Sequence, residues 1–269
     1  MSTALHPSVS LGAGTTYGEG CVFGPGVRIG AACVIGHHVV LHADTIIGKE
    51  VRIDDHATLG KTPMRAANSA VTKEQALPPL TVGDSCIVGT GVVLYRGATI
   101  DSKVLLADLC TVRENVTIGR GTIVGRGVTV ENVCTIGRYC KLESECYLCA
   151  YSTLEDRVFV APGVVTSNDN YVGRTAERFK HFKGVTVRKG GRIGAGSVIL
   201  PVADPSQSRI APATACLIRG RGATARATEG AACRMPVIWA APHRAPGAAW
   251  LIRSPRAPRG GWAKAVKTA

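Results

Sequence analysis

The sequence predicts an all-β solenoid of short parallel strands, and three regularities of the chain predict it. An apolar residue recurs at every sixth position, and these positions are Leu11, Tyr17, Phe23, Ile29, Ile35, Leu41, Ile47, Ile53, Leu59, Val82, Val88, Leu94, Ile100, Leu106, Val112, Ile118, Val124, Val130, Ile136, Leu142, Leu148, Leu154, Val160, Val187, Ile193 and Ile199. A small residue lies four positions after almost every one of them, and Gly often follows directly. A helix requires a period of 3.6 and an ordinary strand a period of 2. A period of six over this length therefore indicates short strands joined by tight corners.

Each hexad is expected to supply one strand and one corner. The large apolar side chain points inward, the small one fills the narrow corner, and we expect the Gly to permit the tight turn. The repeat is interrupted by 61–80 and by 167–184, which are predicted to be loop insertions in a β-helix domain covering 1–203. Loops on a rigid scaffold often contain binding and catalytic residues, so functional residues are expected in these insertions.

The remaining segment, 204–269, is rich in Ala, Arg, Gly and Pro and has no period of 2, 3.6 or 6. We expect it to be an irregular basic tail. Three interpretations stay open: a disordered extension, an arm that binds nucleic acid or a membrane surface, and the product of a reading-frame shift.

The charge of the chain is concentrated in that tail. The 269 residues carry a formal net charge of +13, and 204–269 contribute 11 Lys and Arg against Asp204 and Glu229. Nucleic-acid binding by the whole chain is therefore not expected. The chain has neither an apolar run of about 18 residues nor a secretory leader at MSTALHPSVS, so we expect a cytoplasmic protein without a membrane span.

The corner cysteines and the histidines of the front coils are expected to be structural. Seven of the 10 cysteines occupy the small corner position, where a thiol acts as a small apolar filler: Cys21, Cys33, Cys86, Cys110, Cys134, Cys140 and Cys146. His37 and His42 have a spacing compatible with metal ligation, but the third ligand of such a set is missing. No metal site is therefore predicted.

The second insertion and the coil before it resemble a particular enzyme family. The stretch Lys141–Asn168 (KLESECYLCAYSTLEDRVFVAPGVVTSN), followed by Asp169 and a basic loop, is similar to the hexapeptide-repeat, left-handed parallel β-helix N-acetyltransferases that modify amino groups of nucleotide-linked sugars. This resemblance implies a left-handed β-helix with three hexads per coil, and acetyl-CoA as the acyl donor. It also implies a nucleotide-sugar acceptor and a homotrimer with acetyl-CoA between neighbouring subunits.

The front half has a second likeness. Ala4–Gly60 and Val93–Thr99 are similar to the UDP-N-acetylglucosamine O-acyltransferases of lipid A synthesis. Members of that family use a catalytic His in a later coil, whereas Leu106–Val116 contains none. Because a hydroxyl nucleophile needs a base more than an amine does, transfer to an amine is favoured.

The resemblance and the residues together predict a site. We expect Glu143 and Glu145, which stand where that N-acetyltransferase family commonly has amides, to accept the amine proton, with His181 as the rival base. Asn168, Asp169, Asn170, Tyr171 and Arg174 are expected to hold the sugar nucleotide. Arg178, Lys183 and Arg188 are expected to bind the phosphates of the donor.

Two alternative functions are also compatible with the sequence. One is an O- or N-acyltransferase that uses a longer acyl group on acyl carrier protein. The other is a β-helix scaffold or binding module without catalytic activity.

Overall fold

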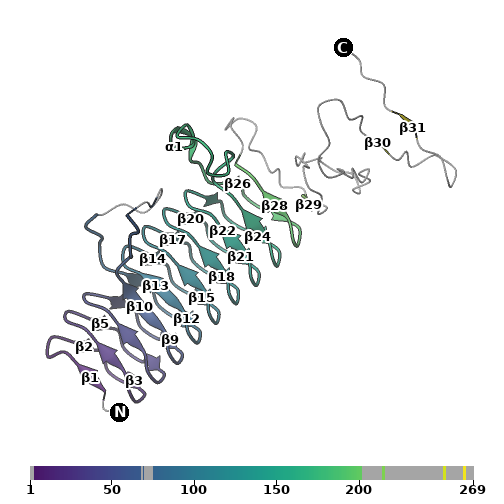
Figure 1. Cartoon of the computed structure of the whole chain (residues 1–269). Helices are drawn as coiled ribbons and strands as arrows, with labels where there is room; N and C mark the ends of the chain where they lie inside the picture. Colours follow the sequence, from purple (N-terminus) through teal and green to yellow (C-terminus); the bar gives the residue numbers. More distant parts are fainter. Residues whose placement is uncertain are drawn as a thin grey trace.

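The computed structural model describes residues 3–67, 69 and 75–201, and the backbone of three two-residue strands further along the chain. It is a left-handed parallel β-helix in which consecutive strands fall in turn into three sheets (Figure 1). Each coil is a triangle with one strand of each sheet, so the prediction of an all-β solenoid with two insertions is confirmed.

We call the three sheets A, B and C in the order in which the chain enters them. Sheet A contains β1 (Ala4–Leu5), β4 (Val22–Phe23), β7 (Val40–Leu41), β10 (Thr58–Lys61), β13 (Val93–Tyr95), β16 (Thr111–Val112), β19 (Thr129–Val130), β22 (Tyr147–Leu148), β25 (Val165–Thr166) and β28 (Val198–Ile199). Sheet B contains β2 (Ser10–Leu11), β5 (Arg28–Ile29), β8 (Ile46–Ile47), β11 (Thr81–Val82), β14 (Thr99–Ile100), β17 (Thr117–Ile118), β20 (Thr135–Ile136), β23 (Thr153–Leu154) and β26 (Thr186–Val187).

Sheet C contains β3 (Thr16–Tyr17), β6 (Val34–Ile35), β9 (Arg52–Ile53), β12 (Ile87–Val88), β15 (Leu105–Leu106), β18 (Ile123–Val124), β21 (Lys141–Leu142), β24 (Phe159–Val160), β27 (Arg192–Ile193) and β29 (Thr214–Ala215). Strands β30 (Leu251–Ile252) and β31 (Ala263–Lys264) pair antiparallel. The rest of 204–269 lies outside the described residues, and the expectations for this segment stay predictions.

The three edges of the prism are named after the sheets that they join. The A–B edge follows each strand of sheet A, the B–C edge follows each strand of sheet B, and the C–A edge follows each strand of sheet C. Equivalent positions in neighbouring coils are 18 residues apart, as in the hydrogen bond between Glu19 and His37.

The inward positions of the hexads form one continuous core. Phe23, Leu59, Leu94 and Leu142 are each fully buried, and the corner cysteines are buried beside them. The first coil differs from the expectation, because Leu11 is 37% exposed and Tyr17 is 42% exposed. They stand in the terminal coil, where no preceding coil covers the core.

The small corner residues also link neighbouring coils. The thiol of Cys134 donates to the carbonyl oxygen of Cys149 at 3.2 Å, and the hydroxyl of Thr122 donates to that of Gly137 at 2.9 Å. Both bonds span 15 residues and join one coil to the next. The corner filler is therefore also a hydrogen-bond donor to a backbone carbonyl group of the next coil.

The glycines that directly follow the inward residues do not make the turns, contrary to the expectation from the sequence. The left-handed backbone conformation lies two positions later, for example at Gly26 with φ of 70° and at Asp44 with φ of 60°. A Cβ atom on Gly30 would instead lie 2.5 Å from the carbonyl carbon of Gly48. These glycines therefore allow close approach of neighbouring coils, and the turn itself is made elsewhere.

Candidate active site

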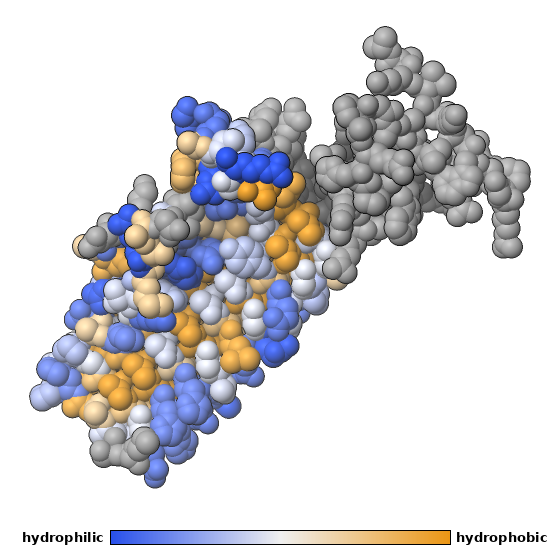
Figure 2. Space-filling view, viewed as in Figure 1, coloured by the Kyte–Doolittle hydropathy of each residue, from blue (hydrophilic) through white to orange (hydrophobic). Residues whose placement is uncertain are grey.

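Both insertions project from the same edge of the prism. The first leaves sheet A after β10 and returns at β11, and the second leaves after β25 and returns at β26, so both belong to the A–B edge (Figure 1). The second contains the short helix α1 (Arg178–His181), which the sequence analysis did not predict. Figure 2 shows that hydrophilic residues dominate this protruding segment.

A ladder of polar and aromatic side chains occupies the A–B edge between the two insertions. Register pairing of the sheet A strands, with a bulge after Leu59, aligns the residues that follow them in one row: His42, Lys61, Tyr95, Arg113, Glu131 and Cys149. Adjacent coils in such a stack are about 4.8 Å apart. At the other two edges, the same position is often glycine.

Arg113 is the centre of this ladder. Its Nε and Nη2 donate to the two carboxylate oxygens of Glu114 at 2.9 and 3.1 Å, and its Nη1 donates to Glu131 at 3.3 Å. The guanidinium also stacks on the ring of Tyr95, with 5.1 Å between Cζ and the ring centroid. The ion pair between Arg113 and Glu131 that the stacking register indicates is therefore present.

The outward face of sheet A supplies a neighbouring hydroxyl group. Loss of hydration and the nearby carboxylate of Glu131 raise the pKa of Tyr147 to about 12. The phenol therefore keeps its proton at neutral pH and can donate a hydrogen bond beside the ladder.

Arg96 fixes the first insertion against the edge. Its Nε donates to the carbonyl oxygen of Leu77 at 3.0 Å, and its Nη1 donates to that of Ala43 at 2.8 Å. Its Nη2 pairs with Asp44 at 3.2 Å. One guanidinium thus joins the end of the insertion to Ala43 and Asp44, which lie two coils before Arg96.

His42 stands at the base of the first insertion. Burial and then the positive charge of Lys61 lower the pKa of His42 below its usual value. Its imidazole is consequently neutral at physiological pH, which is the form that can accept a proton.

Asp169 organises the start of the second insertion. Its two carboxylate oxygens accept hydrogen bonds from the backbone N–H groups of Tyr171 at 2.7 Å and Gly173 at 3.0 Å. Arg178 Nη1 lies 3.2 Å from Asp169 Oδ2. Partial burial opposes ionisation, but these donors outweigh it and hold the pKa of Asp169 below its ordinary value.

The other predicted residues of this insertion are close in space. The rings of Tyr171 and His181 stack with 5.9 Å between their centroids, and His181 Nε2 lies 3.2 Å from Glu177 Oε1. Asn170 donates through Nδ2 to the carbonyl oxygen of Pro201 at 2.8 Å.

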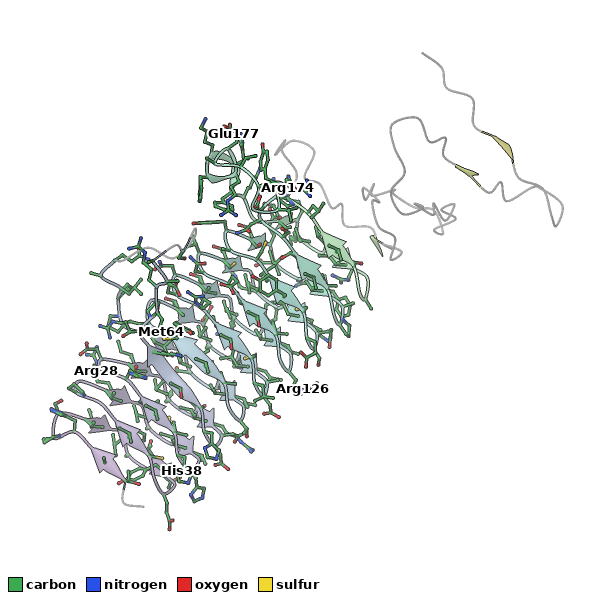
Figure 3. The ribbon with its side chains drawn as sticks, viewed as in Figure 1. Arg28, His38, Met64, Arg126, Arg174 and Glu177 are labelled. Carbon is green, nitrogen blue, oxygen red and sulfur yellow. The ribbon has the colours of Figure 1, made fainter. Side chains whose placement is uncertain are left out.

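Arg178 contributes to holding the insertion as well as to its charge. It pairs with Asp169 and lies over the rings of Phe179 and Phe182, at 4.8 and 5.7 Å from their centroids. Asn168 accepts a hydrogen bond from the backbone N–H of Lys183 at 3.5 Å, at the base of the insertion, whereas Arg174 is exposed. Figure 3 shows Arg174 and Glu177 at this end of the molecule.

Glu143 and Glu145 do not join these residues within one chain. They follow β21 and therefore lie at the C–A edge, across the width of sheet A from the second insertion. Glu145 has its carboxylate over Gly127 and 2.9 Å from Arg126 Nη2. Figure 3 places Arg126 on the side of the solenoid opposite Arg174. The side chain of Glu145 therefore fills the space over Gly127.

Arg188 also lies away from the insertion. It follows β26 at the B–C edge, where its Nη1 lies 2.6 Å from Glu155 Oε1. A hollow of about 350 Å³ beside it is lined by Thr135, Gly137, Thr153, Leu154, Glu155, Asp156 and Lys189. The three predicted phosphate-binding residues are therefore divided between two edges of the chain.

The described residues contain no cluster of metal ligands and no apolar helix of membrane-spanning length. No three His, Cys, Asp or Glu side chains among them gather closely enough to hold a metal ion. No helix in the described part of the chain is long and apolar enough to span a membrane.

Sequence reasoning missed most of the A–B ladder, although the chain carries a signal for it. Among the residues that directly follow the inward positions, those 18 apart in the uninterrupted repeat belong to the same edge. One edge then shows His42, Tyr95, Arg113 and Glu131 where the others often have glycine. Bulky polar residues at a position of close coil contact mark this edge as different.

Comparison with known proteins identifies the fold. No model of a known protein family matches the chain, and no curated protein matches it. Among solved structures, the UDP-N-acetylglucosamine acyltransferase from Campylobacter jejuni is similar with a TM-score of 0.57 and 14% identity, and the match covers 62% of this chain and 66% of that one. The enzyme of that name from Bacteroides fragilis matches with a TM-score of 0.58, 18% identity and the same coverage of 62% and 66%.

The UDP-N-acetylglucosamine acyltransferase from Arabidopsis is also similar, with a TM-score of 0.53 and 16% identity over 72% of this chain and 65% of that one. The chain thus spans just under two thirds of the length of each of these enzymes. At such low sequence identity, the structural similarity shows the fold alone. The chain has the fold of the hexapeptide-repeat, left-handed parallel β-helix proteins, of which these acyltransferases are solved examples.

Proposed function

We propose that the protein is a cytoplasmic acyltransferase that moves an acetyl group from acetyl-CoA to an amino group of a nucleotide-linked sugar. The observation that carries this proposal is the A–B edge, where a polar ladder is bracketed by two insertions on an otherwise regular solenoid. The likeness to acyltransferases of the same fold supports the reaction class. The Lys141–Asp169 stretch supports the choice of an amine acceptor.

The site is completed by a neighbouring subunit of a homotrimer. Within one chain, Glu143 and the second insertion lie on the two edges that flank sheet A. The outward face of sheet A exposes Tyr147, Val165 and Val198 near these edges. Packing of neighbouring solenoids would cover these apolar side chains and bring the C–A edge of one subunit to the A–B edge of the next.

Glu143 is the better of the two carboxylates for the chemical step. Glu145 is paired with Arg126, whereas Glu143 has no ion pair among the described residues. Glu143 would accept a proton from the acceptor ammonium, and the free amine would attack the thioester carbonyl carbon. The nitrogen of the tetrahedral intermediate then loses its second proton, the C–S bond breaks as the amide forms, and the CoA thiolate takes up one of the two protons released by the nitrogen.

The second insertion would bind both substrates. Asn168, Asn170, Tyr171 and Arg174 would contact the sugar nucleotide, while Asp169 fixes the loop that carries them. Arg178, Lys183 and, from the B–C edge, Arg188 would attract the donor phosphates. His181 is the rival proton acceptor, since its imidazole stands in the same insertion.

Mixed oligomers test whether the site crosses a subunit boundary. Glu143→Gln is expected to lower thiol release from acetyl-CoA by about 10²-fold, in the range typical of general-base catalysis. His181→Ala should also lower it, because the His181 ring stacks on Tyr171 and so helps to position the insertion that binds the acceptor. Refolding the two variants together should restore activity, because some sites then combine an intact C–A edge with an intact insertion. Asp169→Asn mixed with His181→Ala is the matched control, since both changes lie in the insertion and no mixed site is intact.

Two outcomes would contradict the proposal. Recovery of activity in neither mixture would place the whole site within one subunit. Absence of thiol release from the wild-type chain with every amino-sugar nucleotide tested, together with no saturable binding of acetyl-CoA, would favour a scaffold without catalysis.

A second candidate reaction is O-acyl transfer from acyl carrier protein. The observation that favours it is the neutral imidazole of His42 at the A–B edge, because a hydroxyl acceptor needs such a base. Loss of activity in His42→Gln with a hydroxyl acceptor, while Glu143→Gln stays active, would select this reaction.

A further inference from the structure

A basic hollow lies at the B–C edge, away from the A–B ladder and its insertions. Its volume is about 240 Å³, and it is lined by Tyr139, Lys141, Arg157, Val158, Phe159 and Arg192. The register of sheet C places Lys141, Phe159 and Arg192 on three adjacent strands. Arg157 stands at the corner that leads into the middle strand. Three cations and two aromatic rings, those of Tyr139 and Phe159, therefore line the hollow.

The positive charges of this hollow have no carboxylate partner in the described part of the chain. Lys141, Arg157 and Arg192 form no ion pair there. The two acids that precede Arg157 in the sequence are already engaged. Glu155 pairs with Arg188 and accepts from the backbone N–H of Lys189 at 2.8 Å. Asp156 Oδ1 accepts a hydrogen bond from the backbone N–H of Arg138 at 2.7 Å.

Arg192 is held in a defined orientation. Its Nη1 donates to the carbonyl oxygens of Arg157 at 2.7 Å, Gly190 at 3.0 Å and Gly191 at 3.2 Å. The Nε and Nη2 groups make no hydrogen bond to the described residues, so they remain available to a ligand. A guanidinium fixed in this way loses little entropy when it binds an anion.

We propose that this hollow binds the pyrophosphate group of a small ligand, either inorganic pyrophosphate or a nucleoside diphosphate. Bringing three like charges together is unfavourable unless an anion neutralises them, and phosphoryl oxygens accept charge-assisted hydrogen bonds from Arg and Lys. The volume is below the range of about 300–1,000 Å³ usual for whole drug-sized ligands, so it suits a phosphate group better than a complete nucleotide. The ring of Phe159 offers a surface on which an attached base can stack.

Binding calorimetry on the full-length chain tests this proposal. Sodium pyrophosphate should bind saturably at about 0.1 M salt, where screening is moderate. Lys141→Gln and Arg157→Gln should each weaken binding by about tenfold, because each removes one charge-assisted contact. The matched controls are Arg120→Gln and Arg138→Gln, which remove a positive charge from the same edge outside the hollow and should change the affinity less than twofold.

A parallel titration distinguishes the two sources of the group. Uridine or adenosine diphosphate should bind more tightly than pyrophosphate if a base stacks on Phe159, and Phe159→Leu should then remove that difference. Equal affinities would mean that the hollow recognises the pyrophosphate group and makes no contact with the base.

Two results would overturn the proposal. One is the absence of saturable heat with pyrophosphate and with both diphosphates. The other is an equal loss of affinity in the control variants, which would mean attraction by the edge as a whole. The measurement needs no acetyl-CoA and no acceptor, so its failure leaves the proposed acyl transfer untouched.

Discussion

Arg113 holds the carboxylate of its chain neighbour Glu114 through two hydrogen bonds, of 2.9 and 3.1 Å, although that side chain is only 2% exposed. Adjacent residues in a strand point to opposite faces, so a bidentate contact between them requires a corner. The A–B edge provides this corner. It allows a buried acid to be neutralised from the surface without a cation inside the core.

Replacing Arg113 should therefore destabilise the fold strongly. Arg113→Met leaves the Glu114 carboxylate buried without a partner, and the expected cost is about 3 kcal/mol, at the lower end of the range for breaking a buried pair. Urea denaturation followed by circular dichroism measures it. Arg126→Met is the control, because that arginine forms an exposed pair with Glu145 and should cost less than about 1 kcal/mol. Similar losses in the two variants would contradict the special role of Arg113.

His42 should make stability fall as the pH is lowered through the ordinary range of histidine. Its pKa in the folded protein lies below the unfolded value of 6.5, so between these two values the unfolded chain binds more protons. Stability then rises with pH across this window and is lost progressively on acidification from neutrality. Thermal melts at pH 5 to 8 on the wild type and on His42→Gln check this.

The prediction concerns the difference in the pH dependence of stability between the wild type and His42→Gln. The variant should lose less stability than the wild type between neutrality and pH 5. A larger loss in His42→Gln would mean that the folded state favours the charged imidazole, and His42 could then not serve as a base.

Asp169 should control the order of the second insertion. Asp169→Asn removes the charge that Arg178 and two backbone N–H groups stabilise, so trypsin should cut after Arg174 and Arg178 several-fold faster. Limited proteolysis with mass spectrometry measures the rate at each site. Glu177→Gln removes only the exposed pairs with Lys180 and His181, which contribute little, so it should change the rate less than about twofold. Equal rates in Asp169→Asn and the wild type would show that other contacts hold the loop.

The cysteines of the solenoid should be inert towards thiol reagents in the native state. Burial raises the pKa of Cys110, Cys134 and Cys146 to about 12 in each case, and the reactive form of a thiol is the thiolate. In a chain with Cys216 and Cys233 changed to serine, an aromatic disulfide reagent should show almost no reaction before urea is added. All eight buried thiols should react after unfolding. Rapid labelling of the folded chain would mean that coils open readily.

The sequence by itself determined the strands, their register and the core of this protein. Once three hexads form a coil, a six-residue period places every inward side chain on its equivalent in the next coil. The burial of Cys134 and the alignment of Val82 on Ile47 across the first insertion follow from this rule. The period also located both insertions, since an interruption of the repeat is visible without any structure.

Only the tertiary structure decided which of the chemically interesting residues lie together. Glu143 and Asn168 are near in sequence but stand on two edges of the prism, because the chain turns a corner between them. His42 and Glu131 are far apart in sequence but share one edge, because coils stack there. Function depends on this placement, and placement arises from the closing of hexads into triangles rather than from the identity of any one residue.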